Sequence, residues 1–110
     1  FADFMIENMW FAIMESARVP VLFNEAISFV VRSEDQEEID YYWQKLSADP
    51  KSEQCGWLKD KFGLSWQIVP KLMDTIMRDQ DKKAQERVTK EFLKMKKFDL
   101  AKLLAAYKNK

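Results

Sequence analysis

The chain has 110 residues, of which 47% are hydrophobic and 14% aromatic, and this is enough apolar material for the core of one domain. Its 18 basic and 18 acidic side chains cancel, which argues against nucleic acid as a partner because phosphate neutralisation needs an excess of Lys and Arg. Histidine is absent, which excludes Ser-His-Asp and Cys-His nucleophile systems and the usual histidine-held metal.

The N-terminal third predicts three strands. Residues 1–6 and 9–15 flank Glu7 and Asn8, a two-residue connection in which Asn tolerates the positive φ of a tight hairpin. Residues 25–32 are rich in β-branched and aromatic side chains and predict a buried strand.

A helix is expected to follow the third strand. Ser33 and Gln36 have the spacing of a capping box, so we expect the helix to begin at Ser33 and to end before Ala48. Acidic residues load its first turns, as a helix N-terminus favours. Apolar side chains recur at helical spacing and predict a core-facing stripe. They are Ile39, Tyr42, Trp43 and Leu46.

The remaining strands are short. Residues 51–53 are expected to form a short edge strand and residues 54–59 a second strand. Residues 60–63 predict a turn that ends in Gly, and residues 64–69 predict a strand that Pro70 stops. With the helix, these segments predict an α+β fold.

Three helices are expected at the C-terminal end. Pro70 suits the first position of a helix, and Leu, Met and Ile residues over 72–77 give that helix an apolar face. A second helix is predicted over residues 82–97. Asp99 is the expected N-cap of a third helix over residues 100–107.

Cysteine and glycine are scarce. One thiol, Cys55, cannot form an intramolecular disulfide, which favours a reducing compartment, and we expect a cytoplasmic protein. No apolar run approaches the roughly 20 residues of a membrane span, so no membrane partner is expected. Two isolated glycines, Gly56 and Gly63, cannot form a Gly-rich phosphate loop or the usual site for S-adenosylmethionine. No cofactor is therefore predicted.

Several segments together resemble the PhnB-like family of the vicinal-oxygen-chelate (glyoxalase/bleomycin-resistance) superfamily. Many members of this family carry the name demethylubiquinone 3-methyltransferase. The segments are FNEAISFVV (23–31), QEEIDYYWQKLS (36–47), QCGWLKDKFGLSWQIVP (54–70) and MKKFDLAKLLAAY (95–107).

The resemblance implies paired βαβββ modules that form a curved mixed sheet around a cup, with a helical tail. Residues 25–69 would be a whole second module, and residues 1–15 the last two strands of the first. The first βαβ part is expected to precede Phe1 or to come from another copy, so we expect a homodimer. The whole chain, 1–110, would be one such domain, and residues 71–110 its C-terminal helical extension.

The resemblance also implies where metal ligands would stand in related proteins. One is a Glu four residues after the Gly of the 60–63 turn, and here that position is Gln67. Another is a His that opens the first strand of the second module, and here Ala26 stands near that place. An amide is a far weaker ligand than a carboxylate, so we predict no metal site.

Strand alternation then gives the candidate ligand-binding residues. If Gln67 faces the cup, so does Ser65, and the parity of Ala26 puts Ser28 on the same side. An inner wall of Trp, Met, Ser and Gln suits a small, mostly apolar ligand with a few polar handles. Gln67 and Ser28 also have a plainer interpretation, since they can bond to each other or to water. The full predicted set is Gln67, Ser28, Trp57, Trp10, Met14, Ser65 and Cys55.

Three hypotheses about function remain open. The first is a PhnB-like protein that binds a small organic molecule without a histidine-held metal. The second is an enzyme, either the methyltransferase that the family name describes or a carboxylate- and metal-dependent one, for which Asp3 and Glu15 are the strand candidates. The third is a structural module whose helical tail caps a partner subunit.

Overall fold

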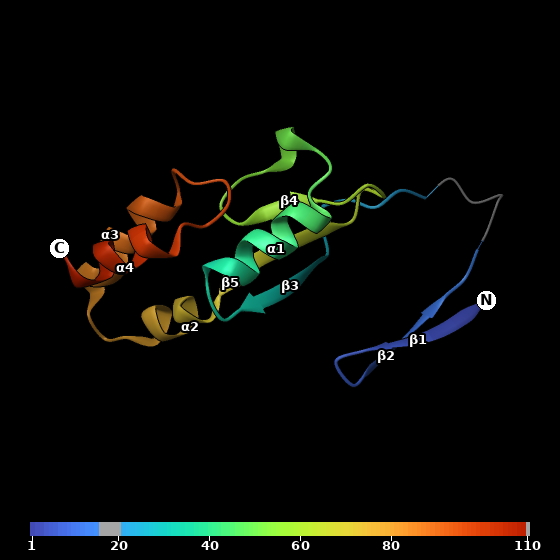
Figure 1. Ribbon diagram of the computed structural model, residues 1–110, viewed down its shortest axis with the longest axis horizontal. Helices are drawn as coiled ribbons and strands as arrows, with labels where there is room; N and C mark the ends of the chain where they lie inside the picture. The colour runs from blue at the N-terminus through green and yellow to red at the C-terminus, as the bar shows by residue number, and fades with distance from the viewer. Residues whose placement is uncertain (16–20, 110) are drawn as a thin grey trace.

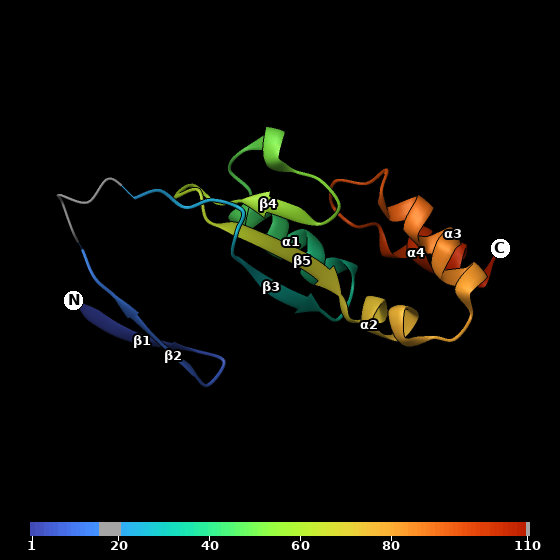
Figure 2. The same cartoon turned by 180° about the vertical axis from the view of Figure 1, so that it is seen from behind.

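The computed structural model describes residues 1–15 and 21–109. Over these residues the chain forms an N-terminal hairpin, a three-stranded sheet with a helix on one face, and a group of C-terminal helices. The hairpin lies at one end of the molecule and the C-terminal helices at the other (Figures 1 and 2). The predicted α+β class is confirmed.

The hairpin pairs β1 (Ala2–Ile6) with β2 (Met9–Ile13) in antiparallel register. Its connection has φ of 50° at Glu7 and 65° at Asn8, the left-handed pair of a two-residue turn. The hairpin predicted from the Asn is therefore confirmed.

The second sheet has the strand order β3-β5-β4. β3 (Ser28–Ser33) runs parallel to β5 (Ser65–Pro70), and β4 (Trp57–Lys59) runs antiparallel to β5. α1 (Gln36–Leu46) and the 3₁₀ helix η1 (Pro50–Ser52) lie between β3 and β4 in the chain. This arrangement has a βαβββ-like pattern.

The described residues do not form the one curved sheet that was expected. Their strands make two separate small sheets, and neither is closed. β3 is an edge strand of the second sheet, and no strand of residues 1–15 or 21–109 pairs with its outer edge. A ring contact joins the two parts, since Phe11 of β2 packs edge-to-face on Phe29 of β3 at 5.8 Å between centroids.

One predicted strand is wrong and another is too long. Residues 51–53 lie at η1, where the Asp49 side chain accepts from the amide of Lys51 and starts the 3₁₀ turn. The predicted strand 54–59 is interrupted because Cys55 and Gly56 both have positive φ, 51° and 84°. They form the two-residue turn of a hairpin, closed by Gln54–Trp57 backbone bonds of 3.1 and 2.8 Å.

The predicted start of α1 is also wrong. Asp35, not Ser33, is the N-cap, and its carboxylate accepts from the amide of Glu38 at 2.9 Å. Glu38 in turn accepts from the amide of Glu34 at 2.8 Å, so this pair satisfies two helix-end donors. Ser33 is buried at the end of β3.

α1 packs on one face of the three-stranded sheet. Its Ile39 is fully buried against Leu58 of β4 and Ile68 of β5. The predicted apolar stripe surrounds this cluster, and the opposite face of the sheet carries no part of it. Partly buried neighbours are Val31, Tyr42, Trp43, Leu46 and Trp66.

The C-terminal helices are α2 (Lys71–Arg78), α3 (Lys82–Phe92) and α4 (Leu100–Lys108). Asp99 caps α4 as predicted, accepting from the amide of Lys102. α3 is shorter than the predicted 82–97, because the chain leaves the helix to dock on the sheet. None of the helices in the described ranges is both long and apolar enough to cross a membrane.

The segment between α3 and α4 is bonded to the turn before β4. The carbonyls of Met95 and Lys96 accept from the amides of Cys55 and Gly56, each at 2.8 Å. The second core cluster adjoins this contact and holds the helices together. It comprises Met73, Ile76, Val88, Phe98 and Leu103.

Gln36 makes a second connection, between α1 and α4. Its Nε2 donates to the carbonyl of Phe98 at 3.0 Å, and its Oε1 accepts from the amide of Leu100 at 2.7 Å. The sheet layer and the C-terminal helices are thus joined at two places.

The two glycines provide a matched test of the first connection. Both have φ near 85°, where a side chain is strained, so Gly63→Ala should lose about 1 to 2 kcal/mol of unfolding free energy. A Cβ at Gly56 would also lie 2.7 Å from the Phe98 ring, whereas nothing lies within 4 Å at Gly63. Gly56→Ala should therefore lose about 1 to 3 kcal/mol more. Urea unfolding measures both, and equal losses would contradict the close packing of Phe98 on the turn.

Candidate functional site

The face of the three-stranded sheet opposite α1 carries the polar residues predicted from strand alternation. Register places Ser28 beside Ser65, and Ser65 beside Lys59, so one row crosses β3, β5 and β4. The next row places Val30, Gln67 and Trp57 side by side. Since paired residues share a face, these six side chains lie on one surface.

Gln67 and Ser28 bond to each other. The Nε2 atom of Gln67 donates to Oγ of Ser28 at 2.9 Å, and both residues are half-buried. This is the plainer interpretation that the sequence allowed. The bond orients the amide, and it leaves the amide oxygen of Gln67 available as an acceptor.

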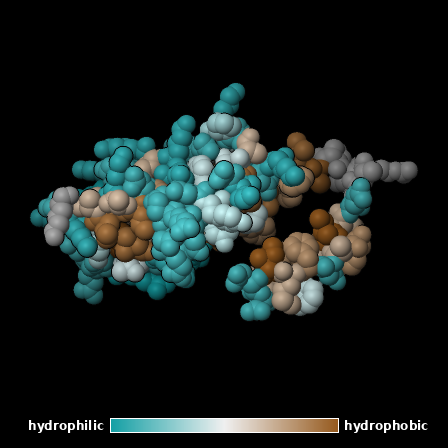
Figure 3. Space-filling view, in the orientation of Figure 1, coloured by the Kyte–Doolittle hydropathy of each residue, from teal (hydrophilic) through white to brown (hydrophobic). Residues whose placement is uncertain are grey.

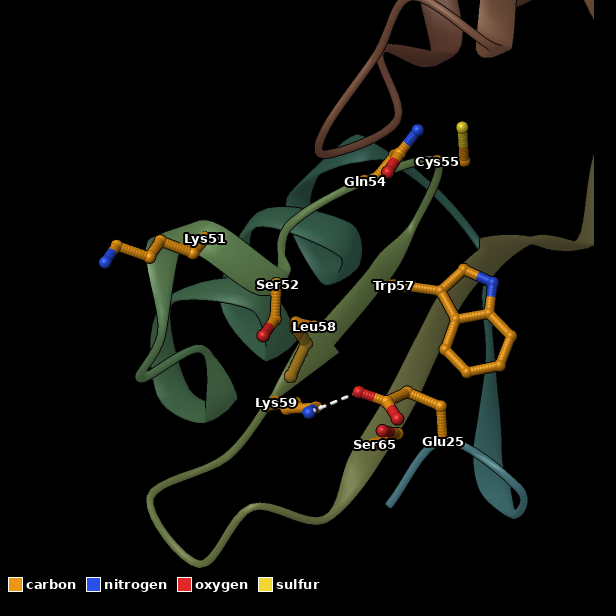
Figure 4. A pocket seen from close by; sticks show the side chains of 9 residues that line it. All are labelled: Glu25, Lys51, Ser52, Gln54, Cys55, Trp57, Leu58, Lys59 and Ser65. Atoms are coloured by element: carbon orange, nitrogen blue, oxygen red, sulfur yellow. Dashed lines mark ion pairs between the residues drawn. The ribbon is translucent and has the colours of Figure 1, made fainter.

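A cavity of about 430 Å³ lies along β4 beside this surface. Figure 4 shows Lys59 and Glu25 facing each other in it, with Ser65 next to Glu25 and the Trp57 ring to one side. η1 and the turn before β4 form the rest of the wall. The lining residues are Glu25, Lys51, Ser52, Gln54, Cys55, Trp57, Leu58, Lys59 and Ser65.

Glu25 and Lys59 form an ion pair across this cavity. The hydrogen bond from Lys59 lowers the pKa of the Glu25 carboxyl below its ordinary value, so Glu25 is ionised at neutral pH. The Glu25 side chain is 63% exposed and the Lys59 side chain 25%. The ammonium is thus part of the wall, while the carboxylate lies over it.

Ser65 is 1% exposed, and its hydroxyl has no hydrogen-bond partner within residues 1–15 and 21–109. A buried polar group normally has a partner, so this one is unusual. It lies in the cavity wall, in register with Lys59.

The other predicted site residues lie away from the Glu25–Lys59 pair. Cys55 is in the turn, and Figure 4 shows its side chain pointing away from the Glu25–Lys59 pair. Its Sγ lies 3.8 Å from the carbonyl of Leu93. Trp10 and Met14 belong to the hairpin end of the molecule, where they are 68% and 74% exposed, and they are not brought to the cavity.

The ion pair of the cavity, Glu25 and Lys59, was not predicted from the sequence. Glu25 precedes β3 and Lys59 ends β4, so they are far apart in the chain and share no motif. The register of Lys59 with Ser65 places Lys59 on the same face as Gln67. Strand alternation from Trp57 would have found Lys59.

The expected metal-ligand positions can now be located. Gln67 lies on the open face, but Ala26 lies before β3, which begins at Ser28, and its amide donates to the Asn24 side chain. Asp60 is occupied by its own turn, accepting from Phe62, Leu64 and the Trp66 indole. Within the described part of the chain, no three His, Cys, Asp or Glu side chains gather as a metal site.

The βαβββ-like order and the parallel β3–β5 pairing define an α+β protein with small sheets. A family model for 3-demethylubiquinone-9 3-methyltransferase matches residues 1–69. The chain therefore belongs to this PhnB-like family of the glyoxalase superfamily. The match includes β1 to β4 and all of β5 except Pro70, and it ends before α2. No curated protein matches the chain.

The Gln67–Ser28 bond can be tested by a double-mutant cycle. Gln67→Leu, Ser28→Ala and the double variant should give a coupling of about 0.5 to 1.5 kcal/mol in unfolding free energy, the net value of one hydrogen bond. Urea unfolding measures it. Strictly additive losses would show that the two side chains act independently.

Proposed function

We propose that this protein binds a small, mostly apolar organic molecule on the open face of the β3-β5-β4 sheet. The observation that carries the proposal is the shared surface of Gln67, Ser28 and Trp57, which combines an aromatic wall with an oriented amide. Ligand sites are usually apolar surfaces with a few fixed polar groups. The proposed ligand lies against Trp57 and Val30 and bonds to the free amide oxygen of Gln67.

The proposed site uses no histidine-held metal. The residue at the expected carboxylate position is an amide, and the one at the expected histidine position is Ala26, whose backbone lies in a turn. In the assembled protein we propose that this face forms one wall of the cup, which the single curved sheet of the superfamily would complete.

An enzyme is the alternative, because the family model that matches is described as a methyltransferase. The methyl donor of such enzymes would need a site for a nucleoside. Gly56 and Gly63 both lie in turns at the ends of β4, and β5 passes directly into α2 through Pro70, so these residues do not form a glycine-rich nucleoside loop. The described residues therefore do not fit the donor, and we derive no transfer step.

A neutral fluorescent probe tests the binding proposal. N-phenyl-1-naphthylamine, an uncharged apolar amine, should bind with an increase in its fluorescence. Trp57→Ala and Gln67→Leu should each weaken this binding by about tenfold or less, as for one anchor or one hydrogen bond. Gln80→Leu, the same substitution at an exposed site between α2 and α3, should leave it unchanged.

Two outcomes would count against the proposal. Equal affinity of Trp57→Ala and the unaltered protein would place the probe elsewhere. Transfer of labelled methyl from S-adenosylmethionine to a short-chain demethylubiquinone would favour the enzyme instead.

We further propose that the protein is a cytoplasmic homodimer and that residues 1–110 form one domain with α2–α4 as its extension. The hairpin supports the dimer, since apolar side chains gather over it (Figure 3) and the outer edge of β3 has no described partner. The backbone bonds from Met95 and Lys96 to the turn support the single domain. A helical tail that caps a partner remains the third hypothesis.

Native mass spectrometry tests the dimer. Met9→Lys with Ile13→Lys, at side chains 61% and 57% exposed on β2, should shift the dimer to monomer because charge at an apolar contact is costly. Met77→Lys on α2, 43% exposed, is the matched control and should remain dimeric. A monomer before any substitution would contradict the proposal.

A further inference from the structure

We propose that the cavity along β4 binds the carboxylate of an aromatic carboxylic acid, and that Glu25 occupies the position this carboxylate takes. Lys59 and Ser65 hold the carboxylate, and Trp57 contacts the ring. The inference rests on the proposed function, since Trp57 belongs to both, and it names the chemical class of the ligand.

Ser65 points to a ligand with an acceptor oxygen. Its hydroxyl is buried and unpaired within the described residues, although it lines a cavity of about 430 Å³. Such a hydroxyl can form a hydrogen bond with a ligand atom that enters the cavity. The register with Lys59 puts the hydroxyl and the ammonium side by side on one face, so one carboxylate can bridge them.

The charges of the cavity wall favour an anionic ligand. Lys59 is the cation that pairs with Glu25 in the cavity, and Figure 4 shows the Lys51 side chain pointing away from that pair. If Glu25 turns outward, the Lys59 ammonium loses its ion-pair partner, while Asp49 nearby stays hydrogen-bonded to Ser52. A cation would then be repelled, and a ligand carboxylate would restore the pairing of Lys59.

The Glu25 side chain is suited to leave its ion pair with Lys59. Glu25 lies in the segment before β3, outside any helix or strand, and its side chain is 63% exposed. Exchanging an exposed ion pair for another costs little, because such pairs contribute little to stability. The Glu25 carboxylate is therefore an internal competitor that a ligand carboxylate displaces.

The ring of the ligand is assigned from the apolar part of the wall. Trp57 lines the cavity and is only half-buried, so its indole face can receive a ring, whereas the next residue, Leu58, is buried in the core against α1. The volume is within the range of small-molecule sites, roughly 300 to 1,000 Å³. An aromatic acid fits both the charged end and the apolar wall.

Calorimetric titration with benzoate tests the proposal, with benzamide as its neutral counterpart and inorganic phosphate as a second anion. We expect benzoate to bind about tenfold more tightly than benzamide. Glu25→Gln should raise the affinity for benzoate about threefold or more, because the internal competitor is lost. Lys59→Met should lower it about tenfold, and Ser65→Ala several-fold.

Exposed residues on α3 supply the controls. Glu86→Gln and Lys90→Met carry the same changes at exposed positions and should leave benzoate affinity unchanged. Equal binding of benzamide and benzoate would overturn the carboxylate assignment. Weaker benzoate binding by Glu25→Gln would overturn the competitor role, and phosphate binding in place of benzoate would overturn the aromatic class.

The neutral probe separates this inference from the proposed function. If N-phenyl-1-naphthylamine still binds with dependence on Trp57 and Gln67 while benzoate shows no preference, the inference fails and the proposed function stands. If neither binds, both fail. Benzoate binding that depends on Lys59 but not on Gln67 supports the inference and leaves the open-face site unsupported.

Discussion

The turn at Cys55 and Gly56 is the constraint on which the rest of the structure depends. Both residues have positive φ, and their amides donate to carbonyls of Met95 and Lys96, some forty residues later. The carbonyl of Gly56 also accepts from the amide of Ile68 at 2.8 Å, so the turn is bonded to β5 as well. β4 therefore begins where this turn ends, and its direction sets which side chains reach the open face.

Much of the fold could be predicted because its signals are local. Asn8 in the first hairpin and Asp99 at the start of α4 each act within a few residues, and both predictions were confirmed. The strand predicted over 54–59 was too long, because its first residues form a turn that Met95 and Lys96 hold. No window of sequence around Cys55 contains that contact. The predicted end of α3 was wrong because Met95 and Lys96, which were expected to lie in the helix, bond to this turn instead.

The candidate site, too, could be predicted only in part. The ligand positions that the resemblance implies, Gln67 and Ala26, set the inward face of each strand. Alternation within the strands then put Ser65 and Ser28 on that face. It could not pair Glu25 with Lys59, because the approach of Glu25 depends on where the chain before β3 runs. The resemblance to glyoxalase-type proteins indicates Gln67 on β5 as a site residue. It does not indicate Lys59, which lies on β4 two residues after Trp57, the partner of Gln67. The family match ends at residue 69, yet residues 95 and 96 hold the turn that leads into β4.

Two buried serines show why the cavity is more than a packing defect. Ser33 and Ser65 both have buried hydroxyls without a partner in the ranges that the structure describes. Ser33 ends β3 and is not part of the wall of the cavity along β4. Ser65 lines that cavity, which also holds the Glu25–Lys59 ion pair. A buried unpaired hydroxyl costs about 1 to 3 kcal/mol wherever it lies. At Ser65, which lines the cavity along β4, the proposed ligand carboxylate would recover that cost, and this is why the proposal rests on Ser65.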